Sequence, residues 1–204
     1  MMATSFQNTA IVILAAGASS RLGSPKQLLE YNGKTLLQHA LDTAMATGCP
    51  KIIVVLGARA ELLKPVLANQ PIEILENNHW QEGMASSIRY ALQHITIAGF
   101  QPESIIFMVC DQPFVTSSLL MSLVEKGVET GMPIVASGYG DKAGTPALFH
   151  KSMFPQLMEL KGDKGARALL AAQPEKVAIV PFPKGVTDID TVADYELLKR
   201  ENDC

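Results

Sequence analysis

A cationic loop that follows an apolar segment is the first stretch of this sequence that could do chemistry. Residues 12–29 read VILAAGASSRLGSPKQLL, so a hydrophobic run passes into small residues and then into Arg21 and Lys26. Small residues let the backbone approach a flat base or a phosphate, and successive N–H groups can form an anion-binding concavity. Arg21 offers a planar fork to phosphate oxygens, and Lys26 is a mobile point charge. The composition is equally compatible with a Gly/Ser-rich turn that carries two solvated cations.

Two widespread phosphate-binding motifs do not account for this loop. A Walker A loop requires G-x-x-x-x-G-K-[ST], but five residues separate Gly17 from Gly23, and Ser24 follows. The dinucleotide fingerprint G-x-G-x-x-G is not supplied either, which argues against a hydride-transferring dehydrogenase. What remains is the pattern L-A-A-G-x-S-x-R-x-G-x-x-K, which begins at Leu14 and ends at Lys26.

Carboxylates stand at two further places where a metal ion could be held. The segment FMVCDQP places Asp111 directly after an apolar run, and Pro113 cannot continue a central strand. A carboxylate there can hold Mg²⁺ against phosphates, because Mg²⁺ prefers oxygen ligands and keeps several waters. Near the end of the chain, Asp188 and Asp190 are spaced to lie on one side of an extended segment. The alternative for Asp111 is an aspartate that begins a turn.

These side chains need a scaffold in which several strands end close together. Apolar, β-rich runs occur at 10–14, 51–56, 72–75, 104–109, 133–137, 146–149 and 176–182, and most are continuously hydrophobic, as in strands covered on both faces. Helical patterns lie between several of them, at 35–48, 58–68, 84–95 and 116–131. Alternating strands and helices predict an α/β fold with a mainly parallel sheet and helices on both sides. Ligands bind such sheets beyond the carboxyl ends of the strands.

Single residues mark several helix ends. Thr116 is a candidate N-cap, and Gly48 and Gly131 are candidate C-caps. Thr191 and Asp194 suit the first turn of a last helix, where their side chains would satisfy free backbone N–H groups. The sequence therefore predicts where these helices begin and end as well as where they lie.

Composition narrows the class of protein. The 204 residues suit one domain, 1–204, and a net charge of −3 argues against nucleic acid or a polybasic membrane contact. No apolar run approaches the roughly 18 residues that span a membrane, and the opening MMATSFQNTA does not predict a secretory signal. Three cysteines without C-x-x-C spacing disfavour a disulfide framework or a zinc site. We expect a reducing cytoplasm.

Taken in order from Ala10 to about Leu198, the motifs resemble those of the MobA-like NTP transferase family. The resemblance rests on the opening loop, the D-Q-P triplet, N-x-x-W-x-x-G-M-x-x-S from Asn77, and D-I-D-T-x-x-D-Y from Asp188. It implies a Rossmann-like three-layer sandwich of the nucleotide-diphospho-sugar transferase type. It also implies transfer of a nucleotidyl group from an NTP to a phosphorylated acceptor, with release of pyrophosphate.

The resemblance assigns roles residue by residue. It makes Lys26, Arg21 and Asp111 catalytic, and Asp111 and Asp190 ligands of Mg²⁺, with Asp188 as the reserve for Asp190. Nucleotide contacts fall on Leu14, Ala15, Ala16, Gly17, Arg21, Lys26, Gly83 and Ser87. For Trp80 and His79, packing and helix capping remain the preferred interpretation.

Two segments are expected to face the acceptor. GDKAGTPALF resembles the family's G-x-P-x-x-F loop through Gly144, Pro146 and Phe149, although many relatives carry a basic residue where this chain has Ala143. The segment GDKGAR at 162–167 matches a family motif and could bring Lys164 or Arg167 to a phosphate, or could simply be a solvated helix N-terminus.

Within the family, LAAG together with the tryptophan segment most resembles the molybdenum cofactor cytidylyltransferases. This implies transfer of CMP from CTP to molybdopterin, as its molybdenum cofactor, and a molybdenum hydroxylase as the client. Ala16 in place of glycine changes the bulk beside the base and favours a pyrimidine over guanine. Two alternatives stay open: another NTP with a sugar-phosphate acceptor, and a non-catalytic carrier of the molybdenum cofactor.

Overall fold

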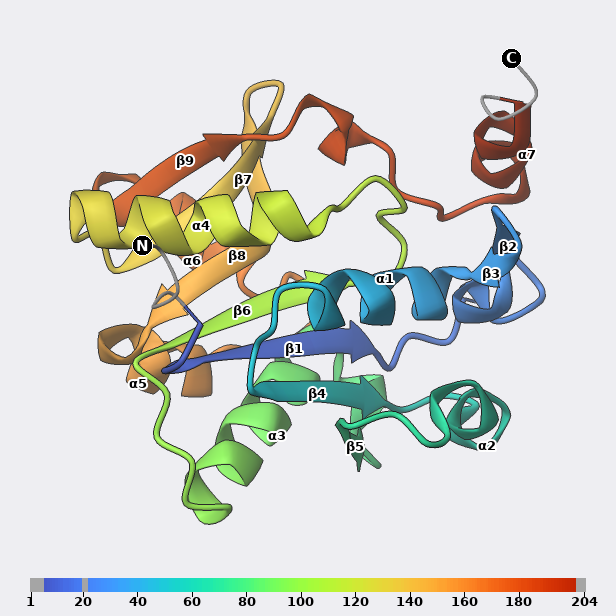
Figure 1. Cartoon of the computed structure of the whole chain (residues 1–204), viewed down its shortest axis with the longest axis horizontal. Helices are drawn as coiled ribbons and strands as arrows, with labels where there is room; N and C mark the ends of the chain where they lie inside the picture. The colour runs from blue at the N-terminus through green and yellow to red at the C-terminus, as the bar shows by residue number, and fades with distance from the viewer. Residues whose placement is uncertain (1–5, 20–21, 201–204) are drawn as a thin grey trace.

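The computed structural model describes residues 6–19 and 22–200. Their central feature is a seven-stranded sheet with the strand order β5-β4-β1-β6-β8-β7-β9, flanked by helices (Figure 1). The strands are β1 (Thr9–Ala15), β4 (Lys51–Leu56), β5 (Glu73–Glu76), β6 (Ser104–Val109), β7 (Ile134–Tyr139), β8 (Lys142–His150) and β9 (Val177–Pro181). The expectation of a Rossmann-like, mainly parallel three-layer α/β fold is confirmed.

The sheet is parallel except around β8. Strand β1 pairs in parallel with both β4 and β6, and β4 with β5. Strand β8 runs antiparallel to β6 and to β7, whereas β7 and β9 are parallel. The carboxyl ends of β1, β4 and β6 therefore meet at one edge of the sheet, where the loop at 16–26 and the D-Q-P triplet begin.

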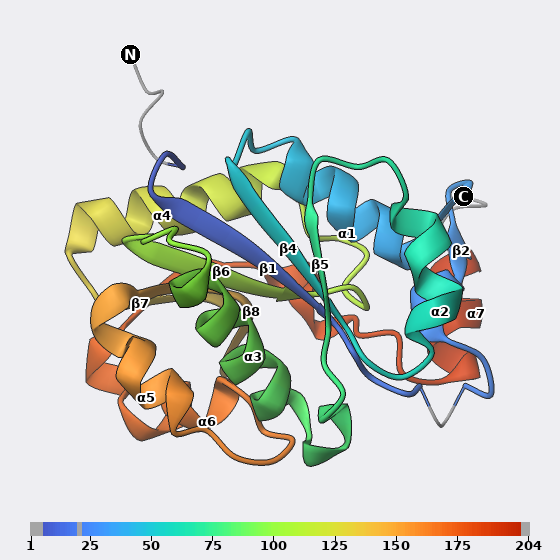
Figure 2. The ribbon, with the colours of Figure 1, turned by 90° about the horizontal axis from the view of Figure 1, so that it is seen from below.

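Helices cover both faces of the sheet (Figure 2). Alternate residues of β1 belong to the two hydrophobic clusters, with Ile11 and Ile13 on one side and Val12 and Leu14 on the other. This explains why the strand is apolar throughout. One face packs against α1 (Leu36–Met45), α2 (Ala60–Leu63) and α4 (Ser117–Thr130), and the other against α3 (Met84–Ile97), α5 (Phe154–Met158) and α6 (Arg167–Ala172).

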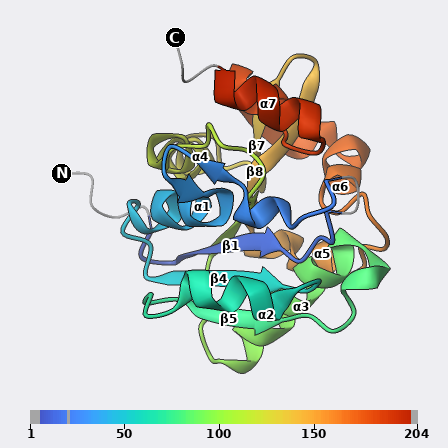
Figure 3. The same ribbon diagram turned by 90° about the vertical axis from the view of Figure 1, so that its right-hand side faces the viewer.

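The last helix closes the described chain beside a small hairpin. Helix α7 (Val192–Arg200) lies next to the antiparallel pair β2 (Glu30–Tyr31) and β3 (Lys34–Thr35) (Figure 3). Tyr195 donates its hydroxyl to the carbonyl of Glu30 at 2.8 Å, and Leu198 packs with Leu36 in a separate apolar cluster. These contacts hold the segment with Asp188 and Asp190 against the first third of the chain.

The predicted helix ends are confirmed in part. Thr116 accepts a hydrogen bond from the Leu119 N–H, and Gly131 ends α4 in the left-handed conformation. Gly48 was expected as a C-cap, but α1 ends at Met45 with Ala46 as its cap. Asp194 and Thr191 cap α7 reciprocally through bonds from the Thr191 N–H (2.7 Å) and the Asp194 N–H (3.2 Å).

The helix predicted at 58–68 is the element that differs most between the prediction and the structure. It divides into α2 and the 3-10 helix η2 (Lys64–Leu67), because Pro65 has no N–H to continue the α-helical ladder. Further 3-10 turns are η1 (Lys26–Leu28), η3 (Trp80–Glu82), η4 (Lys151–Met153), η5 (Pro174–Lys176) and η6 (Pro183–Val186). In the part of the chain that is described, no helix has the length and apolarity to cross a membrane.

Candidate active site

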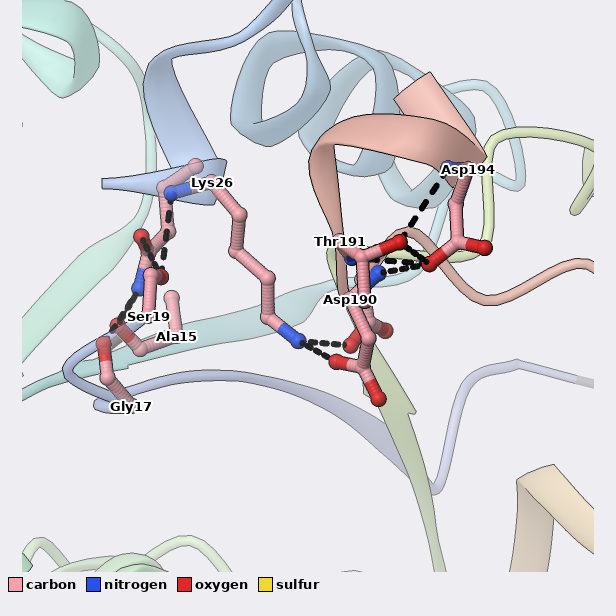
Figure 4. Close-up of polar contacts among 9 residues, drawn as sticks. Ala15, Gly17, Ser19, Lys26, Asp190, Thr191 and Asp194 are labelled. Carbon is pink, nitrogen blue, oxygen red and sulfur yellow. Dashed lines mark hydrogen bonds and ion pairs between the residues drawn. The ribbon is translucent and has the colours of Figure 1, made fainter. Parts of the chain in front are cut away.

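A buried glutamine shapes the loop after β1. Gln27 is 1% exposed, and its Nε2 donates to the carbonyl oxygens of Ala15 and Gly17, both at 2.9 Å. The Lys26 N–H donates to Ser19 Oγ at 3.0 Å (Figure 4). These bonds draw the end of the loop back against its start. They place Lys26 at the beginning of η1 with its side chain directed away from the loop.

Lys26 joins two carboxylates that are distant in the sequence. Its Nζ donates to Asp111 and, at 2.8 Å, to Asp190 Oδ1. The Lys26 and Asp111 side chains are 17% and 15% exposed, whereas that of Asp190 is 41% exposed. Burial works against the charge of Lys26, but the contacts with Asp111 and Asp190 outweigh it and raise the lysine pKa. Three of the charged residues predicted from the sequence, Lys26, Asp111 and Asp190, therefore form one ion cluster.

The backbone holds the two carboxylate segments together. The Ile189 N–H donates to the carbonyl of Asp111 at 3.0 Å, so the D-I-D-T segment lies along the end of β6. Ile189 itself is fully buried with Leu36 and Leu198. Its neighbours on either side, Asp188 and Asp190, both line the same cavity as Asp111.

The two carboxylates supply oxygen ligands of the kind that suit a divalent cation also held by phosphate oxygens and water. Asp111 Oδ1 is buried and, among the described residues, accepts no hydrogen bond. No cluster of three or more His, Cys, Asp or Glu suited to a metal occurs in those residues. Mg²⁺ is commonly held by one or two carboxylates together with phosphate oxygens and water, so two carboxylates fit the ion.

Asp188 differs from Asp190 in its surroundings. Burial, and next the negative charge of Asp111, raise the pKa of Asp188 above its ordinary value. Its Oδ1 is buried without a hydrogen-bond partner among the described residues. Asp190 is the carboxylate that contacts Lys26. Asp190 is therefore part of the ion cluster, and Asp188 lines the same cavity.

Two adjoining cavities surround this cluster. The larger has a volume of about 1030 Å³ and is lined by Lys26, Asp111, Asp188 and Asp190, and by residues of α3, β6, β8 and α6. The smaller has a volume of about 390 Å³. Both are lined by Leu14, Met84 and Asp163, so they adjoin at these residues.

The smaller cavity gathers most of the expected nucleotide contacts. It is lined by Leu14, Ala16, Gly17, Gly83 and Ser87, which come from the loop after β1 and from the start of α3. Trp80 and Gln81 complete its wall. Ala15 does not line it, because its side chain is buried in the core and its carbonyl is bonded to Gln27. Arg21 lies outside the described residues.

Close packing at Gly83 joins the segment at 162–165 to the start of α3. Gly83 has φ +93°, and a Cβ there would lie 2.4 Å from Asp163 Oδ1 and 2.6 Å from the Gly162 carbonyl carbon. The Ala85 N–H donates to the Gly162 carbonyl at 3.1 Å. Only glycine fits at position 83, and Asp163 is thereby brought to the boundary between the two cavities.

The acceptor loop is arranged only partly as expected. Gly144 lines the larger cavity. Phe149 is fully buried and packs edge-on against Phe107, with ring centroids 6.0 Å apart, so its side chain does not face an acceptor. Ala143 packs against the same core cluster. The segment 162–167 is brought to the site, because Asp163, Lys164 and Arg167 all line the larger cavity.

Comparison with known proteins decides the family. The model of the MobA-like NTP transferase domain matches residues 11–177. The chain belongs to the MobA-like NTP transferase family.

Similar proteins cover almost the whole chain. The nicotine blue oxidoreductase of Paenarthrobacter nicotinovorans is 31% identical over 201 residues, which cover 92% of this chain and 95% of that protein. The crystal structure of the homologue of Mycobacterium tuberculosis Rv0371c from Mycobacterium sp. strain JC1 has a TM-score of 0.81 and 33% identity, covering 95% and 96% of the two chains. Rv0371C of M. tuberculosis in complex with manganese has a TM-score of 0.75 and 29% identity, covering 94% and 97%.

Two residues that position this MobA-like site had no role predicted from the sequence. Asn77 is 2% exposed, and its Nδ2 donates to Ser86 Oγ (2.8 Å) and Ser87 Oγ (3.1 Å). Gln27 likewise holds the loop after β1 in place through its hydrogen bonds to two backbone carbonyl oxygens. Asn77 is the first residue of the motif N-x-x-W, which was its only signal. Their role lies in buried hydrogen bonds to partners that the sequence does not identify.

Proposed function

We propose that this MobA-like transferase moves CMP from CTP to the terminal phosphate of molybdopterin, as its molybdenum cofactor, and releases pyrophosphate. The observation that carries the proposal is the ion cluster of Lys26, Asp111 and Asp190, which lies in the larger of two adjoining cavities. A nucleotide in the smaller cavity and an acceptor in the larger would meet there.

The chain's own residues would act mainly by position and charge. Leu14, Ala16 and Gly17 would receive the base and ribose together with Gly83 and Ser87. Lys26 would turn from the carboxylates to the phosphates and stabilise the charge that builds on the leaving pyrophosphate. Asp111 and Asp190 would hold Mg²⁺, which when bound neutralises phosphate charge. The acceptor phosphate is already a nucleophile, so no general base is needed.

The preference for CTP rests on Ala16 and on the resemblance of the motifs. Ala16 is 8% exposed and lines the smaller cavity, so its methyl group takes space beside the base. A base with one ring needs less room than guanine. Because a difference of one methyl or methylene group in a pocket discriminates only modestly, we expect about 10- to 100-fold discrimination rather than an absolute block.

The direct test is turnover of purified protein with molybdenum cofactor and each of CTP, GTP, ATP and UTP, measured as pyrophosphate release. The proposal predicts Mg²⁺-dependent release with CTP above the other nucleotides. Preference for GTP would overturn the cytidylyl assignment, and turnover only with a sugar phosphate would favour that alternative acceptor. Binding of molybdenum cofactor with no pyrophosphate from any NTP would favour the carrier alternative.

An oxidoreductase is the second candidate, because the relative with 31% identity across 92% of this chain is named nicotine blue oxidoreductase. Such a reaction requires an electron donor and has no need of a lysine between two carboxylates. Oxidation of NADH or NADPH in the presence of nicotine blue, undiminished by EDTA and by Asp111→Asn, would support this candidate over transfer.

The setting of the reaction follows from the same proposal. We propose a cytoplasmic enzyme, because its cysteine usage suits a reducing compartment. Its dinucleotide product would then pass to a molybdenum hydroxylase client. Pull-down of such a client by the wild-type protein, and transfer of labelled CMP into it, are the measurements that test this step.

A further inference from the structure

We propose that the Asp163 carboxylate accepts hydrogen bonds from the ribose hydroxyl groups of the nucleotide, and so selects ribonucleotides over deoxyribonucleotides. The inference rests on the proposed function, because the ribose belongs to the nucleotide of that reaction. It adds to the site a carboxylate outside the ion cluster, which recognises the sugar and holds neither Mg²⁺ nor a phosphate.

Asp163 is the charged residue that the two cavities share. Both cavities are lined by Leu14, Met84 and Asp163. The other charged residues that line a cavity belong to the larger one alone: Lys26, Asp111, Lys164, Arg167, Asp188 and Asp190. Within the described part of the chain, its place at the boundary therefore separates Asp163 from every other charged group of the site.

The ribose of a bound nucleotide has to cross this boundary. In the proposed arrangement the base lies in the smaller cavity, and the α-phosphate lies near Lys26 in the larger one. The ribose is the covalent link between the base and the 5′-phosphate, so it passes Leu14, Met84 and Asp163. Its hydroxyl groups lose water there, which is costly unless they find acceptors. Of the three side chains, only that of Asp163 carries oxygen acceptors.

The Asp163 carboxylate has its hydrogen-bonding capacity unused. The residue is exposed, and its side chain makes no hydrogen bond or ion pair with the other residues that the structure describes. An ionised carboxylate only accepts hydrogen bonds, and its two oxygens can receive two neighbouring hydroxyl groups. In dinucleotide-binding α/β folds, an acidic side chain accepts from the ribose 2′-hydroxyl. The chemistry of Asp163 therefore suits a 2′,3′-diol.

Packing against α3 fixes the position of this carboxylate. The Gly162 carbonyl accepts a hydrogen bond from the Ala85 N–H at 3.1 Å, so the segment at 162–165 lies against the start of α3 (Figure 2). The Asp163 Oδ1 atom lies over Gly83, where a Cβ would collide with it. Gly83 is also the N-cap of α3, and the positive end of a helix favours a negative charge beside it. These contacts hold the carboxylate at the boundary without a hydrogen bond of its own.

The base is the alternative partner for the same carboxylate. A carboxylate also accepts from the amino group of cytosine, and in that case Asp163 would discriminate CTP from UTP instead of one sugar from another. The two roles predict changes in different nucleotide pairs. Comparing nucleotides that differ only in the sugar with nucleotides that differ only in the base therefore separates them.

The test compares CTP with 2′,3′-dideoxy-CTP, which keeps the base and the triphosphate but lacks both hydroxyl groups. Dissociation constants are measured by titration calorimetry on the full chain, with Mg²⁺ and without an acceptor. We expect the wild type to bind CTP about tenfold or more tightly than the dideoxy analogue, because hydrogen bonds to a charged acceptor are lost. Asp163→Ala should bring the two constants within about twofold of each other and leave the ratio of CTP to UTP unchanged.

Further variants separate the ribose contact from the charge. Asp163→Asn keeps the shape and one acceptor oxygen, so about a threefold preference for CTP should remain. Loss of a negative charge near the triphosphate changes the affinity for both nucleotides alike, so the ratio of their constants reports the ribose contact. Glu159→Gln is the matched control, since Glu159 is exposed, ends α5 and lines neither cavity. It should keep the wild-type ratio.

Three results would overturn the inference. They are equal binding of CTP and the dideoxy analogue by the wild type, an undiminished preference in Asp163→Ala, and a change in the ratio of CTP to UTP in place of the sugar preference. The last would assign Asp163 to the base.

Failure of the proposed function gives a different pattern. If GTP binds better than CTP, and its preference over dideoxy-GTP depends on Asp163, the cytidylyl assignment falls and the ribose contact stands. If CTP turns over but its hydroxyl groups do not affect binding, the transfer reaction stands and the ribose contact falls. A wild type that binds none of the four NTPs contradicts both.

Discussion

Replacing Asp111 with asparagine perturbs the ion cluster with the least change of shape. The variant removes the negative charge that Lys26 contacts and that we assign to Mg²⁺, yet retains a side chain of the same size. Lys26 is 17% exposed and keeps Asp190, itself 41% exposed, as a partner at 2.8 Å. We therefore expect the variant to lose some folding stability and to lose more of its catalytic rate.

The expected loss in the free energy of unfolding lies between two limits. Removing one member of a buried ion pair costs about 3–5 kcal/mol, and exposed pairs contribute about 0–1 kcal/mol. With Asp190 still present, and with repulsion of Asp188 relieved, we expect a loss of about 1–3 kcal/mol in the free energy of unfolding. Loss of a preorganised charge interaction should lower kcat by about 10²–10³-fold.

The assay combines urea unfolding with pyrophosphate release. Asp42→Asn is the matched control, because it removes the carboxylate from the Lys34–Asp42 pair, whose side chains are 55% and 43% exposed. That variant should lose at most about 1 kcal/mol and keep full activity. Added Mn²⁺ and CTP should raise the melting temperature of wild type but not of Asp111→Asn. A fully active Asp111→Asn protein with unchanged metal response would refute the reasoning.

Three further predictions address other parts of the molecule. Asp188→Asn should stabilise the protein at pH 7, because burial and Asp111 raise the folded pKa of Asp188; the gain should vanish below the unfolded pKa of about 3.9, which unfolding from pH 3 to 7 would test. Gly83→Ala should cost about 1–3 kcal/mol in urea unfolding and weaken CTP binding, since it strains φ +93° and strikes Asp163; unchanged unfolding would contradict this. Burial raises the pKa of Cys49 to about 11 and of Cys110 to about 12, so iodoacetamide at pH 8 should label neither until urea is added; rapid labelling of either residue in the native protein, located by peptide mapping and so distinguished from labelling of Cys204, would disprove their burial.

The sequence was sufficient to predict the sheet and the side chains placed at its edge. Continuous apolar runs are typical of strands covered on both faces, and β1 contributes to both clusters. Because neighbouring parallel strands end at one edge, Lys26 and Asp111 could be expected to meet. Asp190 was assigned to the same site because it belongs to the D-I-D-T-x-x-D-Y motif. The cluster is observed, whereas its roles in catalysis and the single-domain boundary 1–204 stay predictions.

What the sequence could not provide depends on contacts between distant segments. Gly144 and Gly185 must be glycines because a side chain at either position would clash with Tyr139. No local sequence pattern predicts that Tyr139 packs against them. Gln27 and Asn77 are polar residues whose value comes from burial and from their particular hydrogen-bond partners. Phe149 was assigned to the acceptor from its motif, but its strand position turns the ring into the core. Such features follow from packing rather than from residue type.

The central claim is nucleotidyl transfer at the cluster of Lys26, Asp111 and Asp190. The most direct measurement follows the α-phosphate of labelled CTP with molybdenum cofactor and Mg²⁺, in wild type and in Lys26→Gln and Asp111→Asn. The account predicts one pyrophosphate released for each labelled CMP that enters the cofactor, with both quantities reduced at least about 100-fold in each variant. Transfer that continues in both variants, or a wild type that transfers no nucleotide from any NTP, would contradict it.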